Sequence, residues 1–165
     1  MPTSTYTPIA TQTLGSTAST VTFSSIPSTY TDLVLVCNPT TNVTTGQITI
    51  RLNGDTGTNY SRLILWGNAS TAGSATYANE AYAYTGYYTT VYTVPTTNIF
   101  NFSNYSNTSV FKNILGRSNN TSEAVISSLN LWRSTSAITS IELGISVAGT
   151  YSIGSSFTLY GIKAA

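Results

Sequence analysis

The side chains that most often carry catalysis are scarce in this sequence. It contains no histidine, the commonest general base and metal ligand near neutral pH. A serine–histidine triad and a cysteine–histidine pair are therefore excluded. The single cysteine, Cys37, cannot form a zinc site by itself. We expect no bound metal and no cofactor.

Carboxylates are the remaining candidates for catalysis. There are five of them, Asp32, Asp55, Glu80, Glu123 and Glu142. Two suitably spaced carboxylates are enough to hydrolyse a glycosidic bond. Asp32, Asp55 and Glu123 fall beside expected turns, however, where acidic residues are common for structural reasons. The sequence thus predicts that the chain is not an enzyme, with a polysaccharide hydrolase as the enzymatic alternative.

Residues 53–59 allow two interpretations. The segment from Asn53 to Asn59 presents side-chain oxygens at alternating positions, as a calcium-binding loop does. It lacks the further acidic ligands and the terminal bidentate glutamate of an EF-hand. The pair Asn53-Gly54 is also typical of a hairpin turn, in which Asp55 caps the loop. The sequence favours the turn.

Tyrosine is concentrated in one part of the chain. Six of the twelve tyrosines fall within sixteen residues, at positions 77, 82, 84, 87, 88 and 92. Exposed tyrosines suit a protein interface or stacking against a sugar, because the ring is apolar and its hydroxyl is polar. We therefore take as interface or binding candidates Tyr82, Tyr84, Tyr87, Tyr88 and Tyr92. A neighbouring subunit is favoured over a sugar, and inward packing is the structural alternative.

Three other residues are predicted to be buried. Cys37 ends the apolar run 33–37, and Trp66 and Trp132 each end an apolar strand as core anchors. Arg133 follows Trp132 and could stack on its ring as a cation–π pair.

These residues need a scaffold of strands, and the sequence predicts one. Apolar residues alternate with polar ones in segments such as 48–52, 99–102, 110–115, 141–145 and 157–162, with turn residues between them. Eight to ten such strands predict an all-β fold, an antiparallel β-sandwich of jelly-roll-like form. Residues 74–84 hold several alanines, but we interpret them as a loop entering a strand. One domain spans residues 1–165, and residues 1–20 form an edge strand or an extended N-terminal arm.

Composition limits the partners. Charged residues make up 7% of the chain, against roughly 25% in an average soluble protein. The net charge of +1 and the scattered basic residues argue against nucleic acid, and no apolar run is long enough for a membrane span. Weak charge repulsion permits association between copies of the chain. We expect no nucleic acid and no membrane partner, and a chain made in a reducing cytoplasm without disulfides.

Three stretches together resemble a known class of proteins. They are residues 6–27, residues 51–61 with the sequence RLNGDTGTNYS, and residues 132–163. In these stretches the chain resembles small β-rich virion proteins of tailed bacteriophages, especially phages of aquatic bacteria. The similarity lies in turns and strands and includes no chemical motif, so it assigns no functional residue.

The resemblance implies a role on the phage particle, made in the cytoplasm of the bacterial host. It favours a capsid decoration (cement) protein that binds the major capsid protein and other copies of itself. The alternative is a module of the tail or fibre that recognises a receptor or glycan on the host surface.

Overall fold

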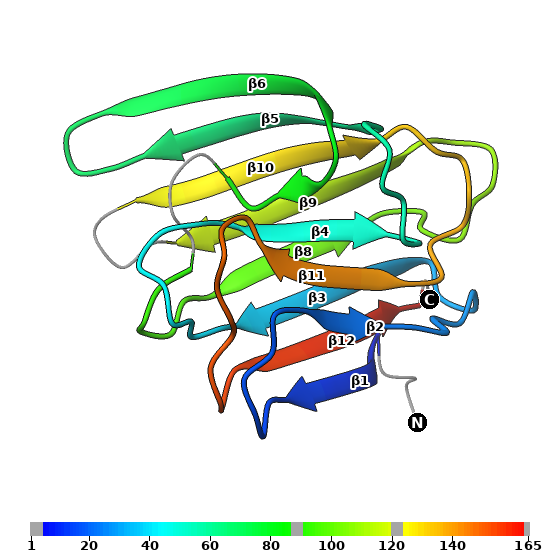
Figure 1. Ribbon diagram of the computed structural model, residues 1–165. Helices are drawn as coiled ribbons and strands as arrows, with labels where there is room; N and C mark the ends of the chain where they lie inside the picture. The colour runs from blue at the N-terminus through cyan, green and yellow to red at the C-terminus, as the bar shows by residue number, and fades with distance from the viewer. Residues whose placement is uncertain (1–4, 87–90, 120–123, 164–165) are drawn as a thin grey trace.

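The computed structural model describes residues 5–86, 91–119 and 124–163, and these residues form twelve β-strands and no helix. Figure 1 shows the strands in chain order. They are β1 (Tyr6–Thr13), β2 (Val21–Phe23), β3 (Asp32–Asn38), β4 (Ile48–Leu52), β5 (Tyr60–Gly67), β6 (Ala72–Glu80), β7 (Ala83–Tyr84), β8 (Asn98–Phe102), β9 (Lys112–Asn119), β10 (Val125–Trp132), β11 (Ile141–Ile145) and β12 (Ser156–Ile162).

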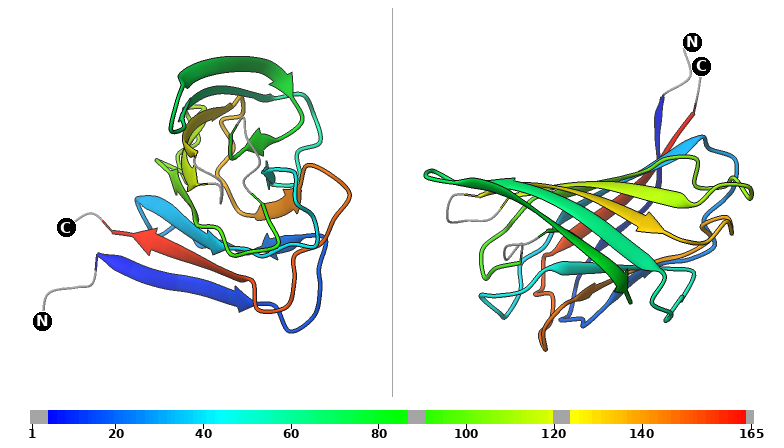
Figure 2. Two further views of the ribbon diagram at one scale, coloured as in Figure 1. Left: turned by 90° about the vertical axis from the view of Figure 1, so that its left-hand side faces the viewer. Right: turned by 90° about the horizontal axis from the view of Figure 1, so that it is seen from above.

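The strands form two antiparallel sheets. The larger sheet has the order β1-β12-β3-β8-β9-β10-β5-β6, and the smaller one has the order β2-β11-β4-β7. Figure 2 shows the larger sheet curving around the smaller one. The predicted all-β antiparallel sandwich is confirmed, and its jelly-roll-like character stays a prediction.

Alternation along the strands builds the core between the sheets. In β9 each buried residue is followed by an exposed one, and β8 and β12 alternate between buried and half-buried positions. The inward side chains of both sheets form one large apolar cluster, which includes Leu35, Ile50, Phe100 and Leu143. Cys37 and Trp132 belong to this cluster, as predicted. Trp66 is half-buried and packs against a smaller cluster around Ile64 and Ile126.

The turn predicted at Asn53-Gly54 is present. Both residues have positive φ, 52° and 69°, and the Asp55 amide donates to the Leu52 carbonyl at 2.9 Å. Two successive positive φ angles define a type I′ turn, which asparagine and glycine adopt at low cost. The turn is not a hairpin, because β4 and β5 belong to different sheets. It is the corner at which the chain passes from the smaller sheet to the larger.

Strand pairing decides the structure of two segments, residues 6–13 and residues 74–84. Residues 6–13 are the edge strand β1, which pairs with β12. Residues 74–84 were predicted to be a loop entering a strand, and the loop in this prediction is wrong. Most of the segment lies in β6, which pairs with β5 from Gly67↔Ala72 to Tyr60↔Glu80, and the rest contains β7. Pairing with a neighbouring strand outweighs the low strand propensity of alanine, glycine and asparagine.

Candidate functional site

The structure brings two of the five predicted tyrosines together. Tyr82 and Tyr84 are half-buried, and their rings meet edge to face with centroids 6.0 Å apart. Tyr92 lies in the loop before β8, where its main-chain carbonyl accepts hydrogen bonds from the Thr41 amide and hydroxyl. Tyr87 and Tyr88 lie outside the described residues.

Two arginines extend the tyrosine pair into a longer stack. The Arg51 guanidinium lies 4.5 Å from the centre of the Tyr82 ring. The Arg62 guanidinium lies 4.2 Å from the Tyr84 ring and 4.3 Å from the Tyr77 ring. A cation at this distance is attracted to the electron-rich face of an aromatic ring. We call these five residues, Arg51, Tyr82, Tyr84, Arg62 and Tyr77, the tyrosine–arginine ladder.

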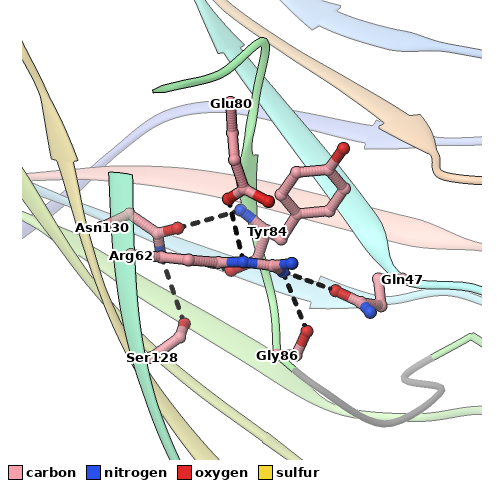
Figure 3. Close-up of polar contacts among 7 residues, drawn as sticks. All are labelled: Gln47, Arg62, Glu80, Tyr84, Gly86, Ser128 and Asn130. Carbon is pink, nitrogen blue, oxygen red and sulfur yellow. Dashed lines mark hydrogen bonds and ion pairs between the residues drawn. The ribbon is translucent and has the colours of Figure 1, made fainter. Parts of the chain in front are cut away.

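The inner end of the ladder is a closed polar cluster, shown in Figure 3. Arg62 donates through Nη1 to Gln47 Oε1 and to the Gly86 carbonyl, both at 3.0 Å. Its Nε lies 2.9 Å from Glu80 Oε2, and the Arg62 side chain is 8% exposed. Burial raises the pKa of Glu80, although the charge of Arg62 opposes this. Burial, and next the charge of Glu80, raise the pKa of Tyr84. Each charge here is matched inside the protein, so this end serves structure.

A buried asparagine holds the two-residue strand β7 in place. The Tyr84 amide donates to Asn130 Oδ1 at 3.0 Å, and Asn130 Nδ2 donates to the Tyr84 carbonyl at 3.2 Å (Figure 3). Asn130 comes from β10 of the larger sheet, whereas β7 pairs with β4 of the smaller one. One side-chain amide thus bonds β7 as a neighbouring strand would, and it ties the two sheets together beside the ladder.

The outer end of the ladder lies beside a pocket on the open face of the smaller sheet. Arg51 of β4 lies opposite Glu142 of β11, and Arg51 Nη1 is 3.0 Å from Glu142 Oε1. Thr49 and Gly144 form the next cross-strand pair with outward positions. Together with Tyr82 these residues line a cavity of about 370 Å³, which we call the small-sheet pocket.

A second open surface is the outer face of the larger sheet. Leu63 on β5 lies opposite Leu129 on β10, which lies opposite Leu115 on β9, and all three are exposed. Leu65 and Val125 extend this apolar area, at exposed fractions of 53% and 67%. We call these five residues the leucine face. Arg117 is the one charged residue at the outward positions of β5, β9 and β10. Contiguous exposed apolar side chains mark interaction sites on soluble proteins.

The two edges of the larger sheet differ. Edge strand β1 carries Pro8, which has no amide hydrogen to donate, and its register shifts between Pro8 and Ala10. Edge strand β6 is nine residues long, mostly exposed, and has no proline, lysine or arginine. Strand β6 has a register shift of its own, between Tyr77 and Glu80, where Asn79 has a positive φ of 57°. Natural sheets block their edges with proline, charged residues and bulges, so β6 is an open edge over residues 72–77 and β1 is a guarded one.

The other predicted candidates have structural surroundings. The Asp55 carboxylate accepts hydrogen bonds from Gly57, Asn59 and Trp132, so the turn interpretation of residues 53–59 fits the structure better than a calcium loop. Asp32 accepts a hydrogen bond from the Asn104 amide, and Arg133 donates to Thr58 and Asn79. Glu123 lies outside the described residues.

The described residues include neither a metal-binding cluster of side chains nor a membrane-spanning helix. No group of three or more histidine, cysteine, aspartate or glutamate residues in the described part of the chain is placed to hold a metal ion. The same residues include no helix with the length and apolar character needed to cross a membrane.

Sequence reasoning named Glu80 and Glu142 as carboxylates but missed the two arginines that pair with them. A signal was present, since Arg51 and Glu142 each interrupt an apolar strand at an outward position, in ITIRL and IELGI. Opposite charges at such positions predict a cross-strand pair once the strands are known to be neighbours. Arg62 and Glu80 gave no comparable signal, because β6 was not predicted as a strand.

Comparison with known proteins gives no match: no family model, no curated protein and no solved structure matches this chain.

Proposed function

We propose that the chain is a structural protein of a tailed-bacteriophage particle, a capsid decoration protein that associates with copies of itself and with the major capsid protein. The open edge of β6, next to the leucine face, carries this proposal. The resemblance of residues 6–27, 51–61 and 132–163 to small phage virion proteins supports the same role.

The occupant of the β6 edge is a second copy of β6. An exposed strand edge presents a row of free amide and carbonyl groups, which an added strand satisfies. Two antiparallel β6 strands related by a twofold axis would join two eight-stranded sheets into one. Charge repulsion across this contact is small, because Glu80 at the strand's end is the one charged residue in β6 and is paired with Arg62.

The leucine face gives the paired sheet a second contact surface. A twofold axis perpendicular to the joined sheet places the leucine faces of both copies on the same side. This doubles an apolar area that carries a single positive charge at Arg117. We assign this side to the shell of major capsid protein, since a broad, weakly charged apolar surface suits a permanent contact.

Sedimentation velocity of the purified chain tests the self-association. We expect a concentration-dependent dimer, weakened at least tenfold by the double substitution Ser74→Lys and Thr76→Lys on β6. The added lysines would face one another across the paired strands, where like charges repel. The matched control is Thr11→Lys with Thr13→Lys on the guarded edge β1, which should leave the dimer unchanged. A wild-type chain that stays monomeric at roughly 100 μM contradicts the proposal.

The role on the particle is tested by counting copies. Quantitative mass spectrometry of purified particles that carry this chain should give a fixed ratio to the major capsid protein, with many copies per particle. A handful of copies would instead place the chain on the tail or fibre.

A further inference from the structure

We propose that the small-sheet pocket binds a neutral saccharide, with Tyr82 as an aromatic wall and Arg51 and Glu142 as hydrogen-bonding partners. The inference goes beyond the structural role, because the pocket lies on the open face of the smaller sheet and its lining includes no residue of β6 or of the leucine face.

The pocket has the size of a small-ligand site, and one of its lining residues, Gly144, has no side chain. Its volume of about 370 Å³ lies within the roughly 300–1,000 Å³ of such sites. Gly144 forms part of the floor, and a Cβ atom at this position would lie 2.9 Å from Thr49 Oγ1. Thr49 is buried at 6% exposure, and it can line the pocket because its cross-strand neighbour is glycine.

The polar groups around the pocket match the hydroxyls of a sugar. A sugar hydroxyl both donates and accepts, so its binding site needs groups of each kind. Arg51 supplies donors, Glu142 supplies acceptors, and the Thr49 and Thr20 hydroxyls supply both. The Arg51 Nε atom is buried without a hydrogen-bond partner among the described residues, although Nη1 is engaged by Glu142.

The charge of the pocket selects a neutral ligand. Arg51 and Glu142 lie 3.0 Å apart, and their charges cancel. An anion would meet the repulsion of Glu142, and a cation that of Arg51. A neutral polyol meets neither, and it can bond to both side chains without separating the pair.

The aromatic surface is fixed before any ligand arrives. Arg51 lies over the Tyr82 ring, and Tyr84 meets the same ring edge to face. Tyr84 is in turn held by Arg62 and Asn130 at the inner end of the ladder. A ring that is already ordered loses little entropy when a sugar packs against the part of it that Arg51 leaves uncovered.

Solution NMR tests this proposal. The ¹H–¹⁵N spectrum of the full chain is recorded with methyl glycosides of glucose, galactose, mannose, rhamnose and N-acetylglucosamine, each up to roughly 50 mM. We expect at least one to shift the Thr49, Arg51 and Gly144 amides saturably, with a dissociation constant of about 1 mM. Tryptophan fluorescence is a poor reporter, because neither Trp66 nor Trp132 lines the pocket.

Variants separate pocket binding from other effects. Gly144→Val should abolish the shifts by filling the floor, and Tyr82→Ala should weaken binding at least tenfold. If Gly144→Val does not fold, Thr49→Val removes one hydroxyl at similar volume and should weaken binding several-fold. The matched control is Tyr160→Ala on β12 of the other sheet, which should leave binding unchanged.

A charge variant tests the selectivity. Glu142→Gln keeps the shape but leaves Arg51 unpaired, so methyl glucuronide and inorganic phosphate should bind at least tenfold more tightly than they bind the wild type. The proposal is overturned if no glycoside in the panel binds, or if Gly144→Val and Tyr82→Ala leave binding unchanged. Neither result affects the β6 contact, whose test is sedimentation.

Discussion

The Asp55 carboxylate shows how a polar residue can specify a corner of the fold. The Gly57 amide donates to its Oδ1 at 2.8 Å, while Asn59 Nδ2 and Trp132 Nε1 donate to its Oδ2 at 2.9 and 2.7 Å. Burial acts to raise the pKa of Asp55, but these hydrogen bonds outweigh it and hold the pKa below the usual 3.8. The charged carboxylate therefore ties the turn after β4 to the end of β10.

This arrangement predicts a pH-dependent stability. A group whose pKa is lower in the folded state stabilises the fold above its unfolded pKa, and this contribution is lost as the pH falls through the folded value. Asp55→Asn should lower the free energy of unfolding by about 1–2 kcal/mol near neutral pH, because an amide nitrogen would face a donor. The deficit should shrink below about pH 4. Urea unfolding of both proteins across roughly pH 2–7 checks this, and a pH-independent difference contradicts it.

Single residues were predictable from sequence where the reason was local. The burial of Cys37 and Trp132 followed from the apolar runs that contain them, and the turn followed from the pair Asn53-Gly54. The contacts of Tyr82 and Tyr84 were not predictable, although the residues themselves were chosen. Their partners come from other strands, and the Arg51–Glu142 pair joins residues 91 positions apart.

At the scale of elements, β7 is the strand most dependent on one contact. It has two residues, pairs with β4 along one side, and lies beside β10 and β5. Its strand bonds are supplemented by the buried side chain of Asn130, whose amide satisfies both the N–H and the C=O of Tyr84. A buried peptide group that loses such a partner carries its full desolvation cost.

Removing this side chain should therefore release β7. We expect Asn130→Ala to lower the free energy of unfolding by about 2 kcal/mol and to abolish slow hydrogen exchange of the Tyr84 amide. Exchange of the amides at the centre of β10 should stay slow. Ser128→Ala is the matched control, since it removes a weaker contact at 3.3 Å from the same strand and should cost less than about 1 kcal/mol. Equal effects of the two substitutions would contradict this role of Asn130.

The strands that sequence predicted are those that bury one face. Segments 48–52, 99–102 and 141–145 alternate because one side of each strand meets the core. Strand β6 lacks this pattern because it lies at the sheet edge and is mostly exposed, so pairing with β5 defines it. For this reason the sequence did not predict the open edge on which the proposed subunit contact depends.

At the scale of the whole molecule, the sequence predicts the class of fold but not the order of the strands in each sheet. Counting strands and turns predicts a sandwich, but β3 lies between β12 and β8, strands far from it along the chain. Neither neighbour of β3 is marked by any local pattern. Pairings of this kind also make the fold cooperative, because β3, which has a neighbour on each side, can be exposed only when distant segments separate.

Cys37 reports on this cooperativity, because it lies in β3 and is completely buried. Burial also raises the pKa of its thiol, which keeps the reactive thiolate scarce in the folded state.

We expect Ellman's reagent to label Cys37 only through global unfolding, so that the labelling rate rises with urea in parallel with the unfolding equilibrium. Ser74→Cys in a Cys37→Ala background places the thiol on the exposed edge β6 and should react at once. Rapid labelling of wild-type Cys37 in a chain that is otherwise stably folded would show that β3 opens alone. The eight strands of the larger sheet would then not unfold as one unit.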